Sequence, residues 1–119
     1  MITVDYKDRR PIYEQLIANI TELALSGELE PDQQLPSVRQ LASQLGINPN
    51  TISKAYMELE RRGVIYSVSG KGSFVNSDLS SAAGDRQKEL EQRLRECIRD
   101  LQRIGADKDR LLDIIGEEF

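Results

Sequence analysis

The chain has 119 residues, a formal net charge of −4, no histidine and a single cysteine, Cys97. This length fits one small domain, or one domain with a short appendage. The lack of histidine and of a second cysteine excludes a Ser-His-Asp triad, the usual zinc sites and an internal disulfide. No run of about 18 apolar residues is present, and the N-terminus lacks a signal-peptide core, so we expect neither a membrane span nor secretion. A lone free thiol suits the cytosol, so we expect a cytoplasmic protein without a metal or cofactor.

Positive charge is concentrated in the middle third of the chain. Residues 33–77 carry five basic side chains against two acidic ones, whereas residues 1–32 and 78–119 are both net acidic. The acidic total argues against a nucleic-acid partner, but a partner that docks on one face responds to the local field. The charge distribution therefore keeps DNA as a candidate partner of the central segment.

The first third of the chain predicts an arm, a helix and a connector. Residues 2–6 alternate apolar and polar side chains, which is typical of a short extended arm. Pro11 suits the first position of a helix whose apolar residues recur at spacings of three and four, and Gly27 is its expected C-terminal cap. Residues 28–36, with a proline near each end, form the connector.

Two short helices are predicted next. Ser37 begins the first with a capping box completed by Gln40, and Gly46 ends it. Asn48 caps the second helix, which runs to about Arg62. Two short helices joined by a brief junction that contains glycine are a candidate helix-turn-helix.

A two-stranded hairpin is predicted directly after these helices. Residues 64–68 and 73–75 have strand-like side chains, and the turn between them is Ser-Gly-Lys-Gly, residues 69–72. A hairpin in this place is a wing. We therefore predict a mainly α fold with a small β-hairpin wing, in which residues 1–76 form a winged helix-turn-helix DNA-binding domain.

The rest of the chain predicts a linker and a C-terminal helical hairpin. Residues 77–85 are small and polar and form the expected linker. Within the helical dimerisation segment, residues 86–119, apolar side chains recur at heptad spacing, and Asp107 caps a last helix. One helix cannot bury such a seam alone, so we expect a homodimer; the alternative is that the seam packs only on its own chain's last helix. The expected seam residues are Leu90, Leu94, Cys97, Leu101, Ile104, Leu111 and Ile115.

The helix after Asn48 predicts a face that contacts DNA. Its outward positions hold Asn, Thr, Ser and Lys, which bond base edges or phosphates, although a solvated polar face is the simpler interpretation. Arg39 lies in the first turn of the preceding helix, where a cation opposes the helix dipole and a phosphate partner would explain it. Lys71, between two glycines at the wing tip, can approach a DNA groove closely. The outward residues are Asn48, Asn50, Thr51, Ser53, Lys54 and Met57.

These motifs resemble those of the GntR family of transcriptional regulators. The resemblance rests on LPSVRQLASQLGINPNTISKAYMELERRGVIYSVSGKGSFV (35–75) and extends back through PIYEQLIANITELALSGEL. The run NPNTISKAYMELERRG and the short tail are most similar to the YtrA-like branch, which has a small helical dimerisation segment and no large ligand domain. The resemblance implies control of nearby transporter genes. It also implies DNA contacts by Arg39, Asn48, Asn50, Thr51, Ser53 and Lys54, with Gly70, Lys71 and Gly72 in the wing.

The sequence departs from the family pattern at two places. The connector has Glu-Pro-Asp-Gln where the family usually has Pro-Gly, but Asp32 tolerates a left-handed conformation, so we expect the turn to survive. Ser69 occupies a wing position where relatives often carry arginine.

We therefore expect a sequence-specific DNA-binding regulator, a repressor that binds an inverted-repeat operator in double-stranded DNA as a homodimer. The alternative is a winged-helix module that binds protein without specific DNA binding. An enzyme is disfavoured, because no histidine or clustered acid pair serves acid–base chemistry. Cys97 as a redox sensor is a further alternative, although a cysteine at a heptad core position is more often a small hydrophobe. Residues 78–119 are too few to enclose an effector pocket of about 300 Å³ within one subunit. A pocket between subunits is the alternative, and the sequence does not identify an effector.

Overall fold

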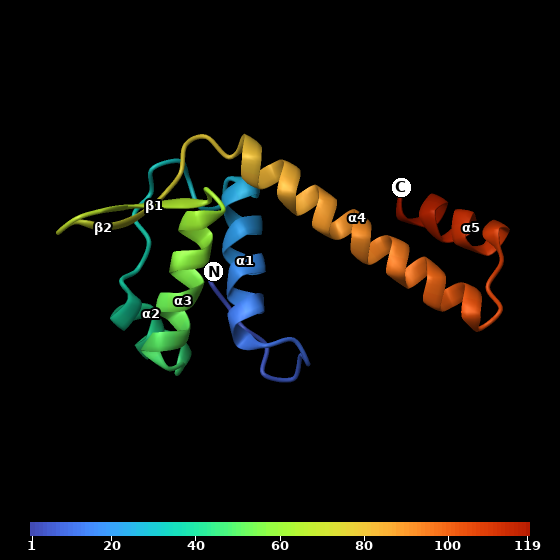
Figure 1. Cartoon of the computed structure of the whole chain (residues 1–119), viewed down its shortest axis with the longest axis horizontal. Helices are drawn as coiled ribbons and strands as arrows, with labels where there is room; N and C mark the ends of the chain where they lie inside the picture. The colour runs from blue at the N-terminus through green and yellow to red at the C-terminus, as the bar shows by residue number, and fades with distance from the viewer. The chain divides into compact units, whose positions relative to one another are not determined.

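The computed structural model describes residues 1–119 and divides the chain at residue 83 into two units, Met1–Ala83 and Gly84–Phe119. Figure 1 shows the elements in chain order. None of the helices combines the length and the apolar character that crossing a membrane requires. The elements are α1 (Ile12–Ser26), α2 (Val38–Leu45), α3 (Pro49–Arg61), β1 (Ile65–Val68), β2 (Gly72–Val75), α4 (Ser80–Arg103) and α5 (Lys108–Glu118).

Helix α1 supplies one side of the core of the first unit. Its residues at spacings of three and four are buried, and Leu16 and Ile20 are fully enclosed. Pro11 occupies the N-cap position, one residue before the helix, where its missing N–H costs no hydrogen bond. Gly27 ends the helix in the left-handed conformation, at a φ of 83°, as a C-terminal glycine cap does.

Helix α3 packs against both α1 and α2, so the three helices enclose one core. The hairpin that follows α3 closes this core with Val64, Ile65 and Val75, all of which are buried. Strands β1 and β2 are antiparallel, with Ile65 opposite Val75 and Val68 opposite Gly72. The predicted wing is therefore present, and its base is part of the hydrophobic core.

The connector before α2 pairs with the wing. The N–H of Leu35 donates to the carbonyl of Ser73 (2.8 Å), the N–H of Asp32 donates to the carbonyl of Val75 (2.8 Å), and the N–H of Val75 donates to the carbonyl of Gln33 (2.9 Å). The sequence indicated only an irregular connector here. Because these bonds join residues about forty positions apart, local patterns carry no sign of them.

Residues 80–85, which we predicted as part of a linker, are helical instead. Helix α4 begins at Ser80, whose N–H donates to the Asp78 carboxylate (3.1 Å), and the N–H of Ala83 donates to the carbonyl of Leu79 (2.8 Å). Alanine has the strongest helix propensity, and Ala82 is buried in the core of the first unit. Small side chains suit a flexible linker, but they also allow the close packing that buries Ala82.

The second unit consists of the rest of α4 and of α5. Gly105 ends the α4 region at a φ of 100°, and Asp107 caps α5 by accepting a hydrogen bond from the N–H of Arg110 (2.9 Å). The two predicted helices and their glycine break are confirmed. No residue of α5 is buried, and the buried hydrophobic residues of the chain all precede residue 84.

Candidate nucleic-acid interface

The junction between α2 and α3 is a tight turn held by side-chain caps. Ser37 accepts a hydrogen bond from the Gln40 N–H (3.1 Å), and the Gln40 side chain accepts one from the Ser37 N–H (2.8 Å), which is the predicted capping box. Gly46 follows at a φ of 66°, a conformation that glycine adopts at little cost. Asn48 then accepts a hydrogen bond from the N–H of Asn50 (2.8 Å). The predicted helix-turn-helix is confirmed.

One face of α3 lies in the core. Ile52, Ala55 and Leu59 are fully buried, and Tyr56 is 6% exposed. The Tyr56 hydroxyl donates to the carbonyl of Pro36 (2.6 Å), which ties α3 to the chain just before α2. Burial raises the pKa of Tyr56 to about 12, so the phenol stays protonated and remains a donor at neutral pH. These contacts set the rotation of α3 about its axis.

The opposite face of α3 lies in solvent. Met57 on this face is 68% exposed. Among the predicted DNA contacts on this helix, Asn48, Asn50 and Lys54 are exposed, and Thr51 and Ser53 are half-buried. The fold therefore presents these polar side chains along one exposed helix surface, as groove recognition requires.

The basic residues of the central segment fall into two groups. Arg39, Lys54 and Lys71 are exposed and form no ion pair. Arg39 lies at the start of α2, Lys54 on α3 and Lys71 at the wing tip, so three separate elements each contribute one cation. Such dispersed cations suit a partner with an extended negative charge, such as a phosphate backbone.

The second group, Arg61 and Arg62, lies at the end of α3 and is paired with a carboxylate of the same helix. Arg61 and Arg62 both donate to the carboxylate of Glu58, with a distance of 2.9 Å from the Arg62 Nε to Oε1. The hydrogen bonds from Arg61 and then Arg62 lower the pKa of Glu58 to about 2. The carboxylate is thus ionised at neutral pH and offsets part of the positive charge that the composition of this segment shows.

The wing tip is braced from the connector. The Nε2 of Gln34 donates to the carbonyl of Lys71 (2.9 Å), and the N–H of Lys71 donates to the carbonyl of Val68 (2.9 Å). Gly72 has a φ of 121°, and a Cβ there would lie 2.9 Å from the Gln34 Nε2. Gly72 therefore leaves room for the amide that orients the backbone of Lys71.

The base of the wing is held by a tyrosine. The Tyr66 hydroxyl donates to the Asp32 carboxylate (2.8 Å), and this hydrogen bond raises the pKa of Tyr66. The rings of Tyr66 and Phe74 stack with centroids 5.6 Å apart. Asp32 has a φ of 62°, so the expectation that it adopts a left-handed conformation is confirmed.

Gln34, Asp32 and Tyr66 position the wing, and sequence reasoning did not assign them this function. Gln34 and Lys71 are 37 positions apart, and Asp32 and Tyr66 are 34 apart, so no local motif connects them. Nor does the chain gather three or more His, Cys, Asp or Glu side chains that could hold a metal ion.

A helix-turn-helix with an exposed polar second helix, followed by a β-hairpin wing, defines the winged helix-turn-helix class of DNA-binding domains. Residues 12–75 match the sequence pattern of the bacterial regulatory proteins of the gntR family. The chain belongs to this family of transcriptional regulators, and the resemblance noted from the sequence is confirmed.

Individual relatives support this assignment, two of them over more than nine-tenths of this chain. The HTH-type transcriptional repressor YtrA of Bacillus subtilis (strain 168) is 37% identical over 98% of this chain and 91% of that protein. A GntR family transcriptional regulator from Listeria monocytogenes has a similar structure, with a TM-score of 0.78 and 31% identity over 92% of this chain and 96% of that one. The DNA-binding domain of AraR in complex with operator ORE1 has a TM-score of 0.53 and 33% identity over 63% of this chain and 92% of that one.

Proposed function

We propose that this chain represses transcription by binding an operator as a homodimer, with α3 of each subunit in the major groove and the wing beside it. The observation that carries the proposal is the exposed polar face of α3, whose rotation is set by its buried face. A repressor among the full-length relatives and an operator complex of a related domain support the same function. Because operator DNA is the proposed partner, we also propose that the protein is located in the cytoplasm.

The proposed contacts divide by chemistry. Asn48, Asn50 and Lys54 are exposed on α3 and contact base edges, and the half-buried Thr51 and Ser53 contact bases or nearby phosphates. Arg39 at the start of α2 contacts the phosphate backbone. The wing residues Gly70, Lys71 and Gly72 lie against a groove, with the cation of Lys71 directed to DNA charge.

The proposed dimer rests on the second unit. A helical unit needs an apolar core to be stable, yet no hydrophobic side chain of residues 84–119 is buried within one chain. Leu90, Leu94 and Ile104 are 44%, 53% and 82% exposed. We assign residues 1–76 to DNA binding and residues 86–119 to dimerisation, and a second copy covers the apolar seam. The seam comprises Leu90, Leu94, Cys97, Leu101, Ile104, Leu111 and Ile115, and the structure adds the exposed Leu112 and Phe119.

A two-fold symmetric dimer presents two identical α3 helices, so the operator is an inverted repeat. The test is an electrophoretic mobility shift with the intergenic DNA beside the protein's own gene. We expect a discrete complex that specific DNA displaces better than random DNA and that weakens as salt rises. Absence of any complex at low salt, together with capture of a protein by the same surface, would favour the protein-binding module instead.

A further inference from the structure

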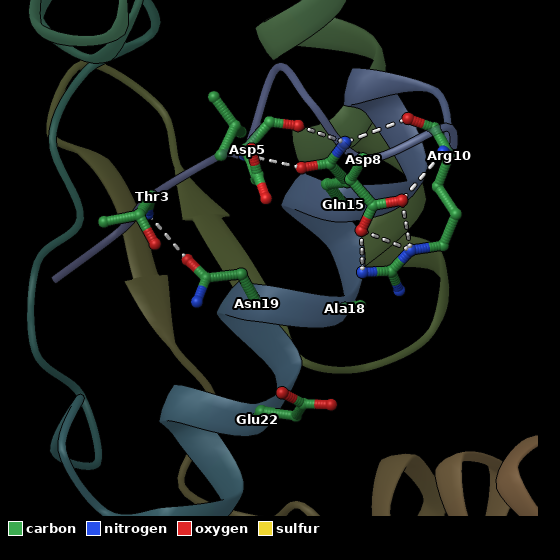
Figure 2. A pocket seen from close by; sticks show the side chains of 9 residues that line it. Thr3, Asp5, Asp8, Arg10, Gln15, Ala18, Asn19 and Glu22 are labelled. Atoms are coloured by element: carbon green, nitrogen blue, oxygen red, sulfur yellow. Dashed lines mark hydrogen bonds and ion pairs between the residues drawn. The ribbon is translucent and has the colours of Figure 1, made fainter.

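The loop formed by residues 5–10, just before α1, is ordered by one buried side chain. The Gln15 amide oxygen accepts the N–H of Asp5 (2.8 Å), and its Nε2 donates to the carbonyls of Asp5 (3.0 Å) and Arg10 (2.9 Å), as Figure 2 shows. Gln15 is only 5% exposed. Both ends of the loop are therefore hydrogen-bonded to the first turn of α1.

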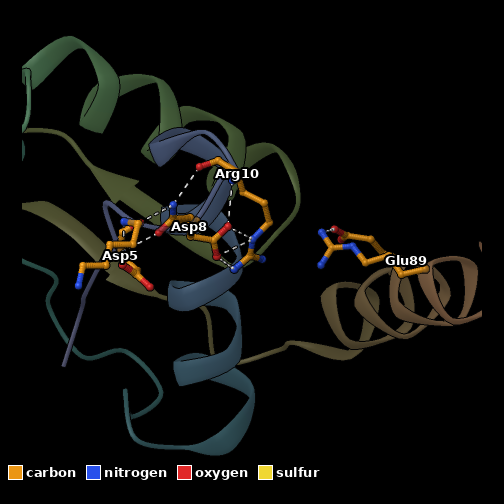
Figure 3. A network of polar contacts seen from close by, with 7 residues as sticks. Asp5, Asp8, Arg10 and Glu89 are labelled. Carbon is orange, nitrogen blue, oxygen red and sulfur yellow. Dashed lines mark hydrogen bonds and ion pairs between the residues drawn. The ribbon is translucent and has the colours of Figure 1, made fainter. Parts of the chain in front are cut away.

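Within this loop the acidic side chains are satisfied internally. The Asp8 carboxylate accepts hydrogen bonds from the Arg10 Nε (3.1 Å) and the second guanidinium nitrogen (2.8 Å), visible in Figure 3. These bonds lower the pKa of Asp8, and Asp5 accepts the backbone N–H of Lys7 (2.9 Å). Lys7 and Arg9 are exposed and form no ion pair. The loop thus presents two cations that form no ion pair, Lys7 and Arg9, and its net charge is +1 because Asp5 offsets part of theirs.

The loop lies beside the helix-turn-helix. The Tyr6 hydroxyl donates to the carbonyl of Leu45 (2.8 Å), the last residue of α2. Tyr13, three residues beyond the loop, lines an open groove of about 670 Å³ together with Thr51 and Lys54 of α3. The Tyr6 hydrogen bond therefore connects the loop to the end of α2, and the groove places Tyr13, in the first turn of α1, beside the helix that we propose enters the major groove.

We propose that the loop of residues 5–10 is a further DNA-binding element, in which Lys7 and Arg9 contact the phosphate backbone that flanks the groove occupied by α3. The proposal rests on the proposed function of α3. Lys7 directly follows the anchored Tyr6, about 3.8 Å away between Cα atoms, and the clamp by Gln15 lowers the entropy lost when the loop meets DNA. Residues 1–32 are net acidic as a whole, so the composition does not single out these two cations. The ion pair between Asp8 and Arg10 shows that Asp8 is not available to pair with Lys7 or Arg9.

Backbone contacts of this kind have a defined salt signature. Each neutralised phosphate contributes about 0.9 to the slope of log K against log salt. Removing Lys7 and Arg9 should lower this slope by about 2 per subunit and weaken binding by about 10-fold to 100-fold at 0.1 M salt. Because phosphates carry no sequence information, operator and random DNA should lose affinity by similar factors.

The experiment compares Lys7→Gln/Arg9→Gln with the full-length wild type by fluorescence anisotropy on both DNAs over a series of salt concentrations. Two control variants are matched to it. Lys88→Gln/Lys108→Gln removes two exposed lysines of the second unit and changes the net charge equally. Asp8→Asn/Arg10→Gln alters the same loop while keeping its net charge. We expect a reduced slope only in the first variant.

Two results would overturn the proposal. One is an unchanged slope in Lys7→Gln/Arg9→Gln when the wild type binds operator DNA. The other is an equal loss in Lys88→Gln/Lys108→Gln, which would mean that net charge alone acts. Failure of the wild type itself to bind DNA would instead refute the proposed function, so the two failures are distinguishable.

Discussion

Asn50 is exposed at the second position of α3, on the side of the helix opposite Ile52 and Leu59. Its amide offers a donor and an acceptor, the pair that an adenine edge requires. Asn50→Ala should cost about 1–3 kcal/mol of operator binding, relax the choice of base at one position per half-site, and leave binding to random DNA nearly unchanged. The measurement is affinity for operator variants at fixed salt.

Arg39→Ala provides the contrast to this variant. Arg39 is also exposed, but it belongs to the start of α2 and carries a charge without an ion pair. Its loss should weaken binding to all sequences nearly equally and lower the salt slope by about 1 per subunit. If Asn50→Ala weakened operator and random DNA by the same factor, α3 would not be contacting bases.

The two wing-tip glycines should respond differently to alanine. A Cβ added at Gly72 would lie 2.9 Å from the Gln34 Nε2, whereas a Cβ added at Gly70 would have no atom beyond its chain neighbours within 4 Å. Both have positive φ, so each alanine costs about 1–3 kcal/mol of backbone strain. We expect Gly72→Ala to destabilise the fold more than Gly70→Ala, because it also displaces the brace on Lys71. Urea unfolding of both variants checks this prediction. An equal loss of unfolding free energy in the two variants would mean that the hydrogen bond from Gln34 to Lys71 does not contribute to stability.

At the scale of elements, the hydrophobic seam of α4 makes a prediction about assembly. Leu94 is 53% exposed in one chain, and the proposed partner covers it. An aspartate there would bury a charge, at a cost on the order of 3 kcal/mol, so Leu94→Asp should weaken the dimer by more than about 100-fold. Sedimentation across a range of concentrations measures the dissociation constant.

Gln92→Asp is the matched control for this variant. It adds the same charge to the same helix, about half a turn away from the seam, and should leave the dimer intact apart from a small repulsion with Glu96. A wild type that is monomeric at micromolar concentration, or a dimer that Leu94→Asp leaves unchanged, would count against the seam.

At the scale of the whole molecule, two identical subunits should protect two half-sites whose centres lie about one helical turn, roughly 10–10.5 base pairs, apart. Inserting about five base pairs between the half-sites rotates one by half a turn and should reduce affinity toward that of a single half-site. Hydroxyl-radical footprinting over a range of protein concentrations, on the native operator and on the operator with the insertion, measures the protected positions and the affinity. Protection of one asymmetric half-site in the native operator would contradict the symmetric dimer.

Much of the architecture follows from local chemistry that the sequence displays. Capping at Ser37, Asn48 and Asp107, glycine at the helix ends, and apolar spacing in α1 and α3 predict every element except α4 within a residue or two. These signals act between residues close in the chain, so they survive without a tertiary context. The exposed polar face of α3 is predictable for the same reason, because one helix turn determines which residues share a face. The start of α4 at Ser80 was missed, because small residues suit a linker and a packed helix equally well.

The tertiary structure alone decided how these elements become a site. It brought Gln34 to the wing tip, Asp32 to Tyr66 and Tyr6 to Leu45, all through bonds between residues more than thirty positions apart. It also showed which cations form ion pairs. Arg61 and Arg62 pair with Glu58, and Arg10 pairs with Asp8. Arg39, Lys54 and Lys71 form no ion pair. Composition counts charges, whereas the potential that a DNA phosphate meets depends on distances, and only the fold sets those distances.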